Sequence, residues 1–474
     1  MAGRALTTTR AGAVSAGQHS GELSRARFRR PELYINREIS LVEFSQRVLD
    51  EAKSARHPLL ERVKFLSFVG SQMDEFMMIR LAGLYDQVDA AVIATGPDGM
   101  LPRQQIDALH VRVRKLLADA HATWEQELRP DLLACGVEIA HYHELTKHQR
   151  DVLATFFRAE ILPVLTPLGV DPGHPFPHIS NRSLNLAVTL SDPGNEPGDL
   201  FARVKVPATL RRLIKVPVRP HKATDPTAPA RYVFTWLEEL MAAHLDLLFP
   251  GFRVVASHPF RVLRDADFEV QTDEAGDLLE TVEQGVMQRR FGATVNLSVQ
   301  PDMPTQVRRL LTENLELDPE DVWEHDAPLG LSDLAELADI DRPDLKDTVT
   351  VARVPVELKR GQDPFMAIRG GDLLLHHPYD AFSSVADFIE AAAQDPQVLA
   401  IKQTLYRVGR NSPIVQALLD ANARGKQVAV LVELKARFDE ENNIEWARTL
   451  EAAGVHVVYG QVNLKTHAKV ALVV

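Results

Sequence analysis

The stretch VLAIKQTLYRV, residues 398–408, begins the most regular part of the chain. Three further apolar runs follow it, and these are VAVLVEL over 428–434, VHVVY over 455–459 and HAKVALVV over 467–474. Runs of this length and composition predict buried β-strands. Because segments of helical character separate the first three runs, we expect an alternating parallel sheet, covered by helices on both faces.

Residues at the helix boundaries support this alternation. Ser412 is a typical capping residue, Pro413 suits the first helical position, and Gly425 comes just past the end of the same helix. Asp439 stands at the capping position of the next helix, which we expect to end at Gly454. The helices and strands are therefore predicted to be joined by short connections.

The remaining regions differ in composition and pattern. Residues 1–30 are rich in Ala, Gly, Ser, Thr and Arg, which predicts a disordered tail. Residues 31–138 carry amphipathic helical patterns and are predicted to form a helical domain. Residues 139–350 mix helical and strand patterns, as in a mixed α/β head domain, and residues 351–474 form the alternating domain described above. The predicted fold class is multidomain α+β.

Two patterns within these regions give sharper expectations. A long helix is predicted from Pro102 to about Leu133, because apolar residues recur there at steps of three and four. The predicted apolar face consists of Ile106, Leu109, Val113, Leu116, Ala120, Trp124 and Leu128. By contrast, residues 313–347 are strongly acidic, with the acids evenly spread, and are predicted to form a solvated surface and connector.

The composition excludes several classes of protein. In 474 residues, 45% hydrophobic and 25% charged residues are typical of a globular chain of about three domains. No apolar run reaches ~18 residues, which argues against a membrane-spanning helix, and the single cysteine, Cys135, excludes an intrachain disulfide. We expect a cytoplasmic protein without a nucleic-acid partner. Because the formal charge is −12, an anion would bind only in a local cationic pocket.

Cationic residues follow two of the predicted strands. Arg407 ends the first strand, and Lys435 and Arg437 end the second. Ligands of parallel sheets bind beyond the carboxyl ends of the strands, and the planar guanidinium group can hold two phosphate oxygens at once. A second interpretation, equally weighted, is that the arginines form surface ion pairs with Asp439 or Glu440.

His467 and Lys469 favour the first interpretation. Side chains at i and i+2 of a strand share a face, so the imidazole and the ammonium group are predicted to lie together on a buried strand. Burial of both groups is costly unless something pairs with them. A bound phosphoryl group would satisfy both.

Other motifs are weaker candidates. His174 and His178 have the spacing of metal ligands on a helix, but the prolines beside them exclude a helix. His141 and His143 are interpreted as surface residues rather than metal ligands. The chain contains no G-x-G-x-x-G, no complete phosphate loop of the Walker type and no G-x-S-x-G, so these nucleotide loops and serine hydrolase chemistry are unsupported.

Six motifs occur in a fixed order along the chain. They are YINRE at 34–38, DEF at 74–76, HPFPHISN at 174–181, IKQTLYRV at 401–408, VELKARFDE at 432–440 and LKTHAK at 464–469. This set resembles the motifs of polyphosphate kinases of the phosphohistidine type, from about residue 33 to the end. The resemblance implies a phospholipase-D-like fold for residues 351–474 and a Mg²⁺-dependent enzyme, an ATP:polyphosphate phosphotransferase, which moves the γ-phosphoryl group reversibly between ATP or ADP and inorganic polyphosphate.

The resemblance also implies roles for single residues. His467 matches the histidine that becomes phosphorylated, with Lys469 beside it as a second catalytic residue. Arg407 and Arg437 match arginines near Mg²⁺-bound phosphates. We expect them to bind phosphate oxygens, while Mg²⁺ is held through those phosphates and water, without an assigned protein ligand. Gln72 stands where the family has an asparagine near the nucleotide base.

The resemblance further implies homodimers or larger assemblies formed through the helical domain, and it leaves association with a membrane surface open. The family continues into a second phospholipase-D-like domain, so we expect this chain to be a fragment that lacks the last domain. Two alternatives are a fragment that acts only as an inactive scaffold and a phospholipase-D-like phosphodiesterase. The phosphodiesterase motif H-x-K-x-x-x-x-D has Val474 at its last position here, which favours the kinase.

Overall fold

A computed structural model gives the fold of most of the chain. It describes residues 28, 30–170, 176–193, 199–218, 230–266, 279, 291–326, 328–359, 361–434, 436, 439–460 and 464–474. The chain divides into two compact units: unit 1 comprises Met1–Ala266 and Ala293–Asp347, and unit 2 comprises Asp267–Gly292 and Thr348–Val474. The predicted tail lies outside the described residues, apart from Phe28 and Arg30. In the described residues, no helix is both long and apolar enough to cross a membrane.

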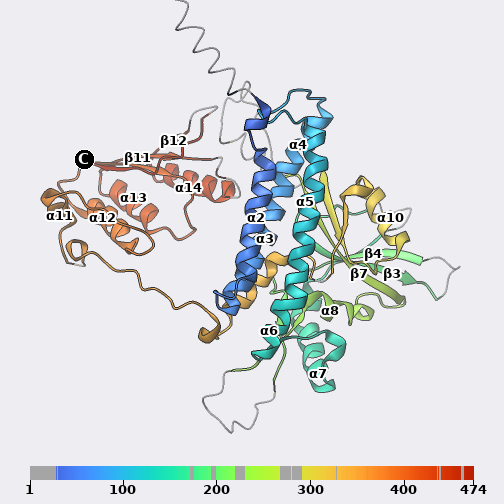
Figure 1. Cartoon of the computed structure of the whole chain (residues 1–474). Coiled ribbons are helices and arrows are strands. Elements are labelled where there is room, and N and C mark those ends of the chain that lie inside the picture. The colour runs from blue at the N-terminus through green and yellow to red at the C-terminus, as the bar shows by residue number, and fades with distance from the viewer. Residues whose placement is uncertain are drawn as a thin grey trace, which may run out of the picture. The chain divides into compact units, whose positions relative to one another are not determined.

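Helices form one layer of unit 1 (Figure 1). They are α2 (Arg37–Lys53), α3 (Leu59–Glu75), α4 (Ala82–Asp89), α5 (Pro102–Thr123) and α6 (Arg129–Ala134). The π-helical segments η2 (Phe76–Leu81) and η3 (Trp124–Leu128) connect α3 to α4 and α5 to α6. The predicted apolar face of the long helix is confirmed, because all seven of its residues are at most 2% exposed.

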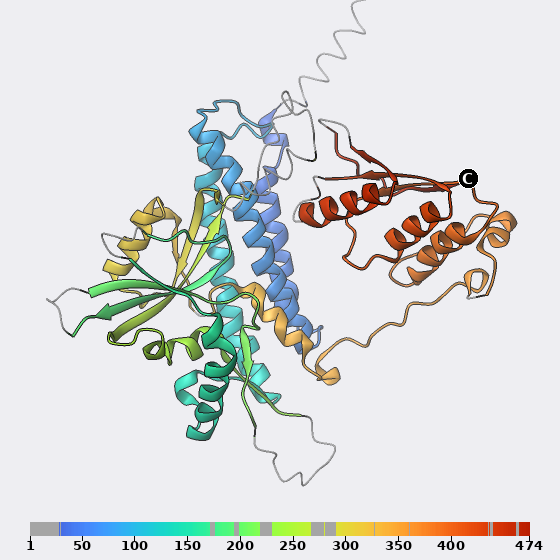
Figure 2. The same ribbon diagram turned by 180° about the vertical axis from the view of Figure 1, so that it is seen from behind.

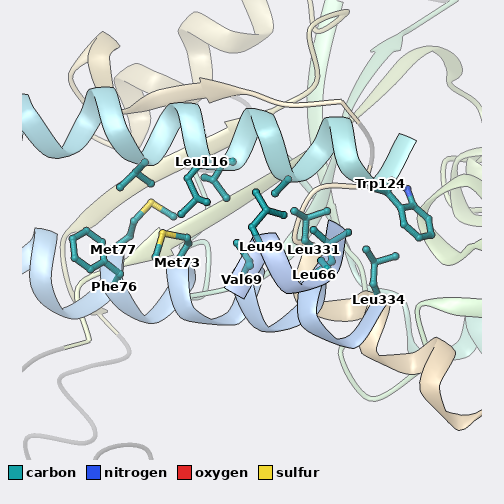
Figure 3. Packing of buried hydrophobic residues seen from close by; sticks show 14 of the residues in the cluster. Leu49, Leu66, Val69, Met73, Phe76, Met77, Leu116, Trp124, Leu331 and Leu334 are labelled. Carbon is teal, nitrogen blue, oxygen red and sulfur yellow. The ribbon is translucent and has the colours of Figure 1, made fainter. Parts of the chain in front are cut away.

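The acidic stretch is not simply a solvated connector, contrary to our prediction. Within it, the 3₁₀ helix η10 (Leu331–Asp339) buries Leu331, Leu334 and Leu337. Figure 3 shows Leu331 and Leu334 packed beside Leu66 of α3. In a 3₁₀ helix every third residue shares a face, so the leucines point inward while acids occupy other faces. The backbones approach closely, because a Cβ on Gly70 would lie 2.6 Å from the Ser332 nitrogen.

Two sheets complete unit 1. The larger sheet has the strand order β2-β4-β3-β7-β8-β9, in which only the pair β8–β9 is parallel, and the smaller has the order β1-β6-β5. The strands are β1 (Val137–Ile139), β2 (Pro167–Val170), β3 (Leu184–Ser191), β4 (Asp199–Lys205), β5 (Leu213–Lys215), β6 (Tyr232–Trp236), β7 (Arg253–Arg264), β8 (Thr294–Val299) and β9 (Val322–Glu324). The accompanying helices are α7 (Lys147–Phe156), α8 (Leu237–Ala242) and α10 (Thr305–Asn314).

A buried ion pair connects the helical layer to the larger sheet. Asp74 of α3 accepts two hydrogen bonds from Arg261 of β7, at 2.7 and 2.6 Å, and both side chains are less than 10% exposed. Gly330 leaves room for this guanidinium group: its φ is +83°, and a Cβ there would lie 2.9 Å from Arg261 Nε. The DEF motif therefore has a structural role in unit 1 through its aspartate.

Unit 2 contains a four-stranded sheet of order β12-β11-β10-β13. Its elements are α11 (Pro364–Gly370), α12 (Ser383–Gln394), β10 (Ala400–Leu405), α13 (Pro413–Ala423), β11 (Gln427–Val432), α14 (Glu440–Ala452), β12 (His456–Tyr459) and β13 (Ala471–Val473). The predicted alternation and the parallel pairing of the first three strands are present. Gly425 and Gly454, at φ values of +80° and +84°, follow the helices as expected.

Two expectations for this sheet were wrong. The helices α12, α13 and α14 lie on one face of the sheet rather than on both (Figure 1, Figure 2). Right-handed crossovers that step in one direction, from β10 to β11 to β12, put their helices on the same side. The fourth strand is also shorter than predicted, because β13 contains only Ala471–Val473 and pairs antiparallel with β10.

Candidate active site

The carboxyl ends of β10 and β11 are held together by one buried side chain. Asn443 of α14 is 1% exposed, and its Nδ2 donates to the carbonyl oxygens of Tyr406, at 2.6 Å, and Glu433, at 2.9 Å. These two residues directly follow the two strands. The chain that leaves each strand is therefore fixed at the place where parallel sheets bind ligands.

Arg407 lies at the end of β10, as predicted. Its side chain is 56% exposed, and its Nε lies 2.9 Å from Oδ2 of Asp439. Asp439 stands at the capping position of α14, but its side chain makes no capping hydrogen bond. The ion-pair interpretation of Arg407 thus describes this structure, and an exposed pair of this kind contributes only ~0–1 kcal/mol. Lys435 and Arg437 lie outside the described residues.

His467 and Lys469 are not on a buried strand, contrary to our prediction. Both are exposed and precede β13. The side chain of Thr404 bonds with the backbone of this segment: its Oγ1 donates to the carbonyl oxygen of Ala468 at 2.8 Å and accepts from the Val470 amide at 2.9 Å. The backbone of this segment is thus bonded partly to the Thr404 side chain. Because His467 and Lys469 are not in a strand, the rule that residues i and i+2 share a face does not apply to them.

Three of the predicted residues, Arg407, His467 and Lys469, nevertheless lie around the ring of Tyr406. The His467 ring lies 5.1 Å from it, centre to centre, with the ring planes at 84°. Lys469 Nζ lies 4.0 Å from the ring centre, and Arg407 Cζ lies 5.8 Å from it. Lys465 Nζ is also near, at 5.5 Å. We call Tyr406, Arg407, Lys465, His467 and Lys469 the Tyr406 cluster.

Sequence reasoning did not assign Tyr406 and Lys465 to the site. Both stand in the motifs that carry Arg407 and His467, so their signal was adjacency to predicted site residues. Tyrosine occurs both inside proteins and at their surface, so its position after a buried strand does not by itself indicate a site. In the structure, three cationic side chains lie near its ring.

The contacts of the cations with the Tyr406 ring are weak. Lys469 Nζ donates a hydrogen bond of 2.6 Å to the carbonyl oxygen of His467, and it also faces the Tyr406 ring. An exposed cation–π contact contributes ~0.5–1 kcal/mol, whereas a hydrogen bond to a charged group contributes ~1.5–3 kcal/mol. Phosphate oxygens can therefore compete with the ring for these ammonium and guanidinium groups. Chemically, the cluster combines the exposed imidazole of His467, which can act as a nucleophile, with hydrogen-bond donors for a multiply charged anion.

Three family models match consecutive parts of the chain. They describe the polyphosphate kinase N-terminal domain over residues 34–140, the polyphosphate kinase middle domain over 148–337 and the polyphosphate kinase C-terminal domain 1 over 363–474. The chain belongs to the polyphosphate kinase family. The family resemblance drawn from the six motifs is thereby confirmed.

Individual polyphosphate kinases match along nearly the whole chain. Polyphosphate kinase 1 of Chlorobaculum tepidum is 52% identical over 446 residues, which cover 94% of the chain and 63% of that protein. The polyphosphate kinase of Mycolicibacterium gilvum is 46% identical over 445 residues, which cover 93% of the chain and 60% of that protein. The crystal structure of polyphosphate kinase from Porphyromonas gingivalis matches with a TM-score of 0.74 and 28% identity, over 93% of the chain and 61% of that structure. The chain thus spans about three fifths of the length of these relatives.

Gln72, the position expected near a nucleotide base in this family, lies on α3 of unit 1. Its side chain is half-buried, and its Oε1 accepts a hydrogen bond of 3.0 Å from Ser45 of α2. The structure therefore shows what positions Gln72, whereas its role toward a nucleotide stays a prediction.

In the described residues, no group of three or more His, Cys, Asp or Glu side chains is placed to hold a metal ion. Mg²⁺ prefers oxygen ligands, and the Tyr406 cluster presents cationic donors instead. His141 is half-buried rather than exposed, and its Nδ1 lies 2.9 Å from Oε1 of Glu239. His174 lies outside the described residues.

Proposed function

We propose that this chain supplies the phosphorylated histidine of a polyphosphate kinase, which transfers the γ-phosphoryl group of ATP to inorganic polyphosphate and back. The observation that carries the proposal is the Tyr406 cluster, in which the side chains of His467, Lys469, Lys465 and Arg407 all contact the ring of Tyr406. Family membership supports the choice of polyphosphate as the acceptor. The phospholipase-D-like character of unit 2, the homodimer and the cytoplasmic location belong to the same proposal.

The reaction has two balanced steps. A ring nitrogen of neutral His467 attacks the γ-phosphorus, so that an N–P bond forms while the bond to the β,γ-bridging oxygen breaks and ADP leaves. A terminal oxygen of polyphosphate then attacks the phosphohistidine, so that a P–O bond forms and the N–P bond breaks. Both steps reverse without another reactant, which accounts for transfer in either direction.

The cations of the cluster act on the transferred group. Phosphoryl transfer passes through a loose transition state with charge on the peripheral oxygens, and positioning and positive charge provide most of the catalysis. Lys469 and Arg407 would hold these oxygens, and Arg437 is proposed to join them. Mg²⁺ would be bound through the phosphates of the nucleotide, where it offsets their charge.

Isotope transfer tests this proposal. The chain is incubated with ATP labelled in the γ-phosphate, beside the variant His467→Ala and the control His456→Ala, which changes an exposed histidine of β12. Acid-labile label is expected on the chain and on the control, and none on His467→Ala. Label that survives in His467→Ala would remove His467 from the mechanism. Release of product from a phosphodiester, without labelling from ATP, would favour the phosphodiesterase, and no activity on either substrate would favour the inactive scaffold.

A further inference from the structure

Tyr406 occupies the centre of the cluster, but phosphoryl transfer as proposed above gives it no role. Among the described residues, its ring contacts four side chains from two segments: Arg407 beside it in sequence, and Lys465, His467 and Lys469 from the segment before β13. Like charges repel one another, so an attracting group favours the gathering of three cationic side chains at one place. The aromatic ring is the group that they share.

A neutral ring attracts cations without cancelling their charge. The negative face of an aromatic ring binds ammonium and guanidinium groups. A carboxylate in the same position would also attract them, but it would neutralise one positive charge and compete with an incoming phosphate. Arg407 illustrates the difference, because Asp439 lies 2.9 Å from its Nε.

The backbone that carries the Tyr406 ring is fixed at the end of β10, whereas the lysine and arginine side chains around the ring are long and flexible. The Tyr406 backbone directly follows β10, and its carbonyl oxygen accepts the 2.6 Å hydrogen bond from buried Asn443. Lysine and arginine side chains lose much conformational freedom when they are fixed. A ring on a fixed backbone holds these side chains near their bound positions before the ligand arrives. Less conformational freedom is then lost on binding, and preorganisation of this kind increases affinity.

We propose that Tyr406 is a positioning residue of the phosphoryl-transfer site: its ring assembles Lys465, Lys469 and Arg407 around the His467 imidazole before a phosphate binds. This inference rests on the proposed function. The phosphate oxygens then take the cations from the ring face, while the ring remains beside the imidazole. The ring rather than the hydroxyl group carries the role, because the contacts are to the ring.

The test compares Tyr406→Phe, which keeps the ring, with Tyr406→Leu, which removes it, in the full 474-residue chain. The control is Tyr379→Leu, because Tyr379 is an exposed tyrosine of unit 2 whose ring also contacts a histidine, His376, at 5.1 Å. Thermal unfolding of each variant establishes that it is folded. The measurements are the binding of inorganic tripolyphosphate by calorimetry and the initial rate of labelling of His467 from ATP.

We expect Tyr406→Leu to bind tripolyphosphate about tenfold more weakly and to be labelled about tenfold more slowly, as lost preorganisation of several charged side chains would produce. Tyr406→Phe and Tyr379→Leu should remain within about twofold of the unchanged chain. Equal binding and labelling in Tyr406→Leu and the unchanged chain would overturn the proposal. Equal impairment of the Phe and Leu variants would also overturn it, because the hydroxyl group would then be responsible.

A third readout separates this inference from the proposed function. The ring current of Tyr406 shifts the proton resonances of the His467 imidazole, and nuclear magnetic resonance detects this shift without any reaction. The shift should persist in Tyr406→Phe and disappear in Tyr406→Leu. If the unchanged chain is never labelled, the proposed function fails, while weaker tripolyphosphate binding and a lost shift in Tyr406→Leu still support the positioning role. An unaltered imidazole shift in Tyr406→Leu would contradict the contact itself.

Discussion

The carboxylate of Glu433 accepts a hydrogen bond of 2.5 Å from the backbone amide of Thr466, the residue before His467. Glu433 is 4% exposed and directly follows β11. One buried acid thus connects the end of a strand to the segment that carries His467 and Lys469. This contact, rather than a long strand, helps to place that segment beside β10 and β11.

Replacing Glu433 should loosen this segment. A hydrogen bond to a charged group contributes ~1.5–3 kcal/mol, so Glu433→Ala should accelerate amide exchange in residues 464–470 by about tenfold or more. Glu433→Gln keeps an oxygen acceptor, so its exchange rate should lie between those of Glu433→Ala and the unchanged chain. Peptide-resolved hydrogen–deuterium exchange measures the effect, with α13 as an internal reference. Unchanged exchange in Glu433→Ala would show that the contact does not hold the segment.

Removing the carboxylate of Asp439 should strengthen anion binding. In Asp439→Asn, Arg407 no longer has this acid as a competitor of phosphate oxygens, and the exposed ion pair that is lost is worth ~0–1 kcal/mol. Tripolyphosphate should therefore bind up to about fivefold more tightly. Calorimetry with Asp420→Asn, a substitution on α13, provides the matched control. Weaker binding in Asp439→Asn would mean that Asp439 assists the ligand instead of competing with it.

The buried pair of Asp74 and Arg261 should be sensitive to the loss of either partner. Asp74→Asn leaves the guanidinium group buried without its counter-ion, which typically costs ~3–5 kcal/mol. Arg261→Met should cost a similar amount, whereas the double variant should be more stable than the sum of the two losses predicts. Urea unfolding of unit 1 within the whole chain measures these changes. Fully additive losses would indicate that the two residues act independently.

Two stacked histidines should make unit 1 sensitive to acid. The rings of His121 and His325 lie 4.9 Å apart, and burial lowers the pKa of His121 to about 3 and that of His325 to about 4. The positive charges of Arg114 and Arg261 contribute to the lowered pKa of His325. Because both pKa values lie below the value of 6.5 for an unfolded histidine, the unfolded chain binds more protons. The stabilisation is present above pH ~6.5 and is lost as the pH falls toward these lower values.

The expected slope is ~1.4 kcal/mol per pH unit for each histidine in this range. His325→Phe keeps a ring in the stack but removes one titrating group, so its unfolding free energy should fall less between pH 6.5 and 5. Urea unfolding at the two pH values measures the difference, and His143→Phe, which changes another histidine of unit 1, serves as a control. The same pH dependence in His325→Phe and the unchanged chain would contradict this account.

The sequence predicted elements whose cause is local. The apolar face of α5 follows from helical periodicity, and Gly425 and Gly454 follow α13 and α14 because each adopts a positive φ. The position of Arg407 at a strand end could be predicted because the apolar run of the strand itself is a local pattern.

Features that depend on distant contacts could not be predicted. The strand order puts α13 and α14 on one face of the sheet, and the sequence of neither helix indicates this order. The hydroxyl group of Thr404 bonds to a segment more than sixty residues away, and this contact replaces the expected strand around His467. The Tyr406 cluster likewise forms only when the end of β10 and the segment before β13 come together.

The central claim is that His467 receives the phosphoryl group. The most direct measurement is the mass-spectrometric localisation of phosphate on peptides of the unchanged chain after incubation with Mg²⁺ and ATP, under conditions that preserve phosphohistidine. Phosphate on His467, removed when inorganic polyphosphate is added and equal in amount to the ADP formed, is the predicted result. Formation of ADP with phosphate on another residue, or with His467 unmodified throughout, would contradict the claim.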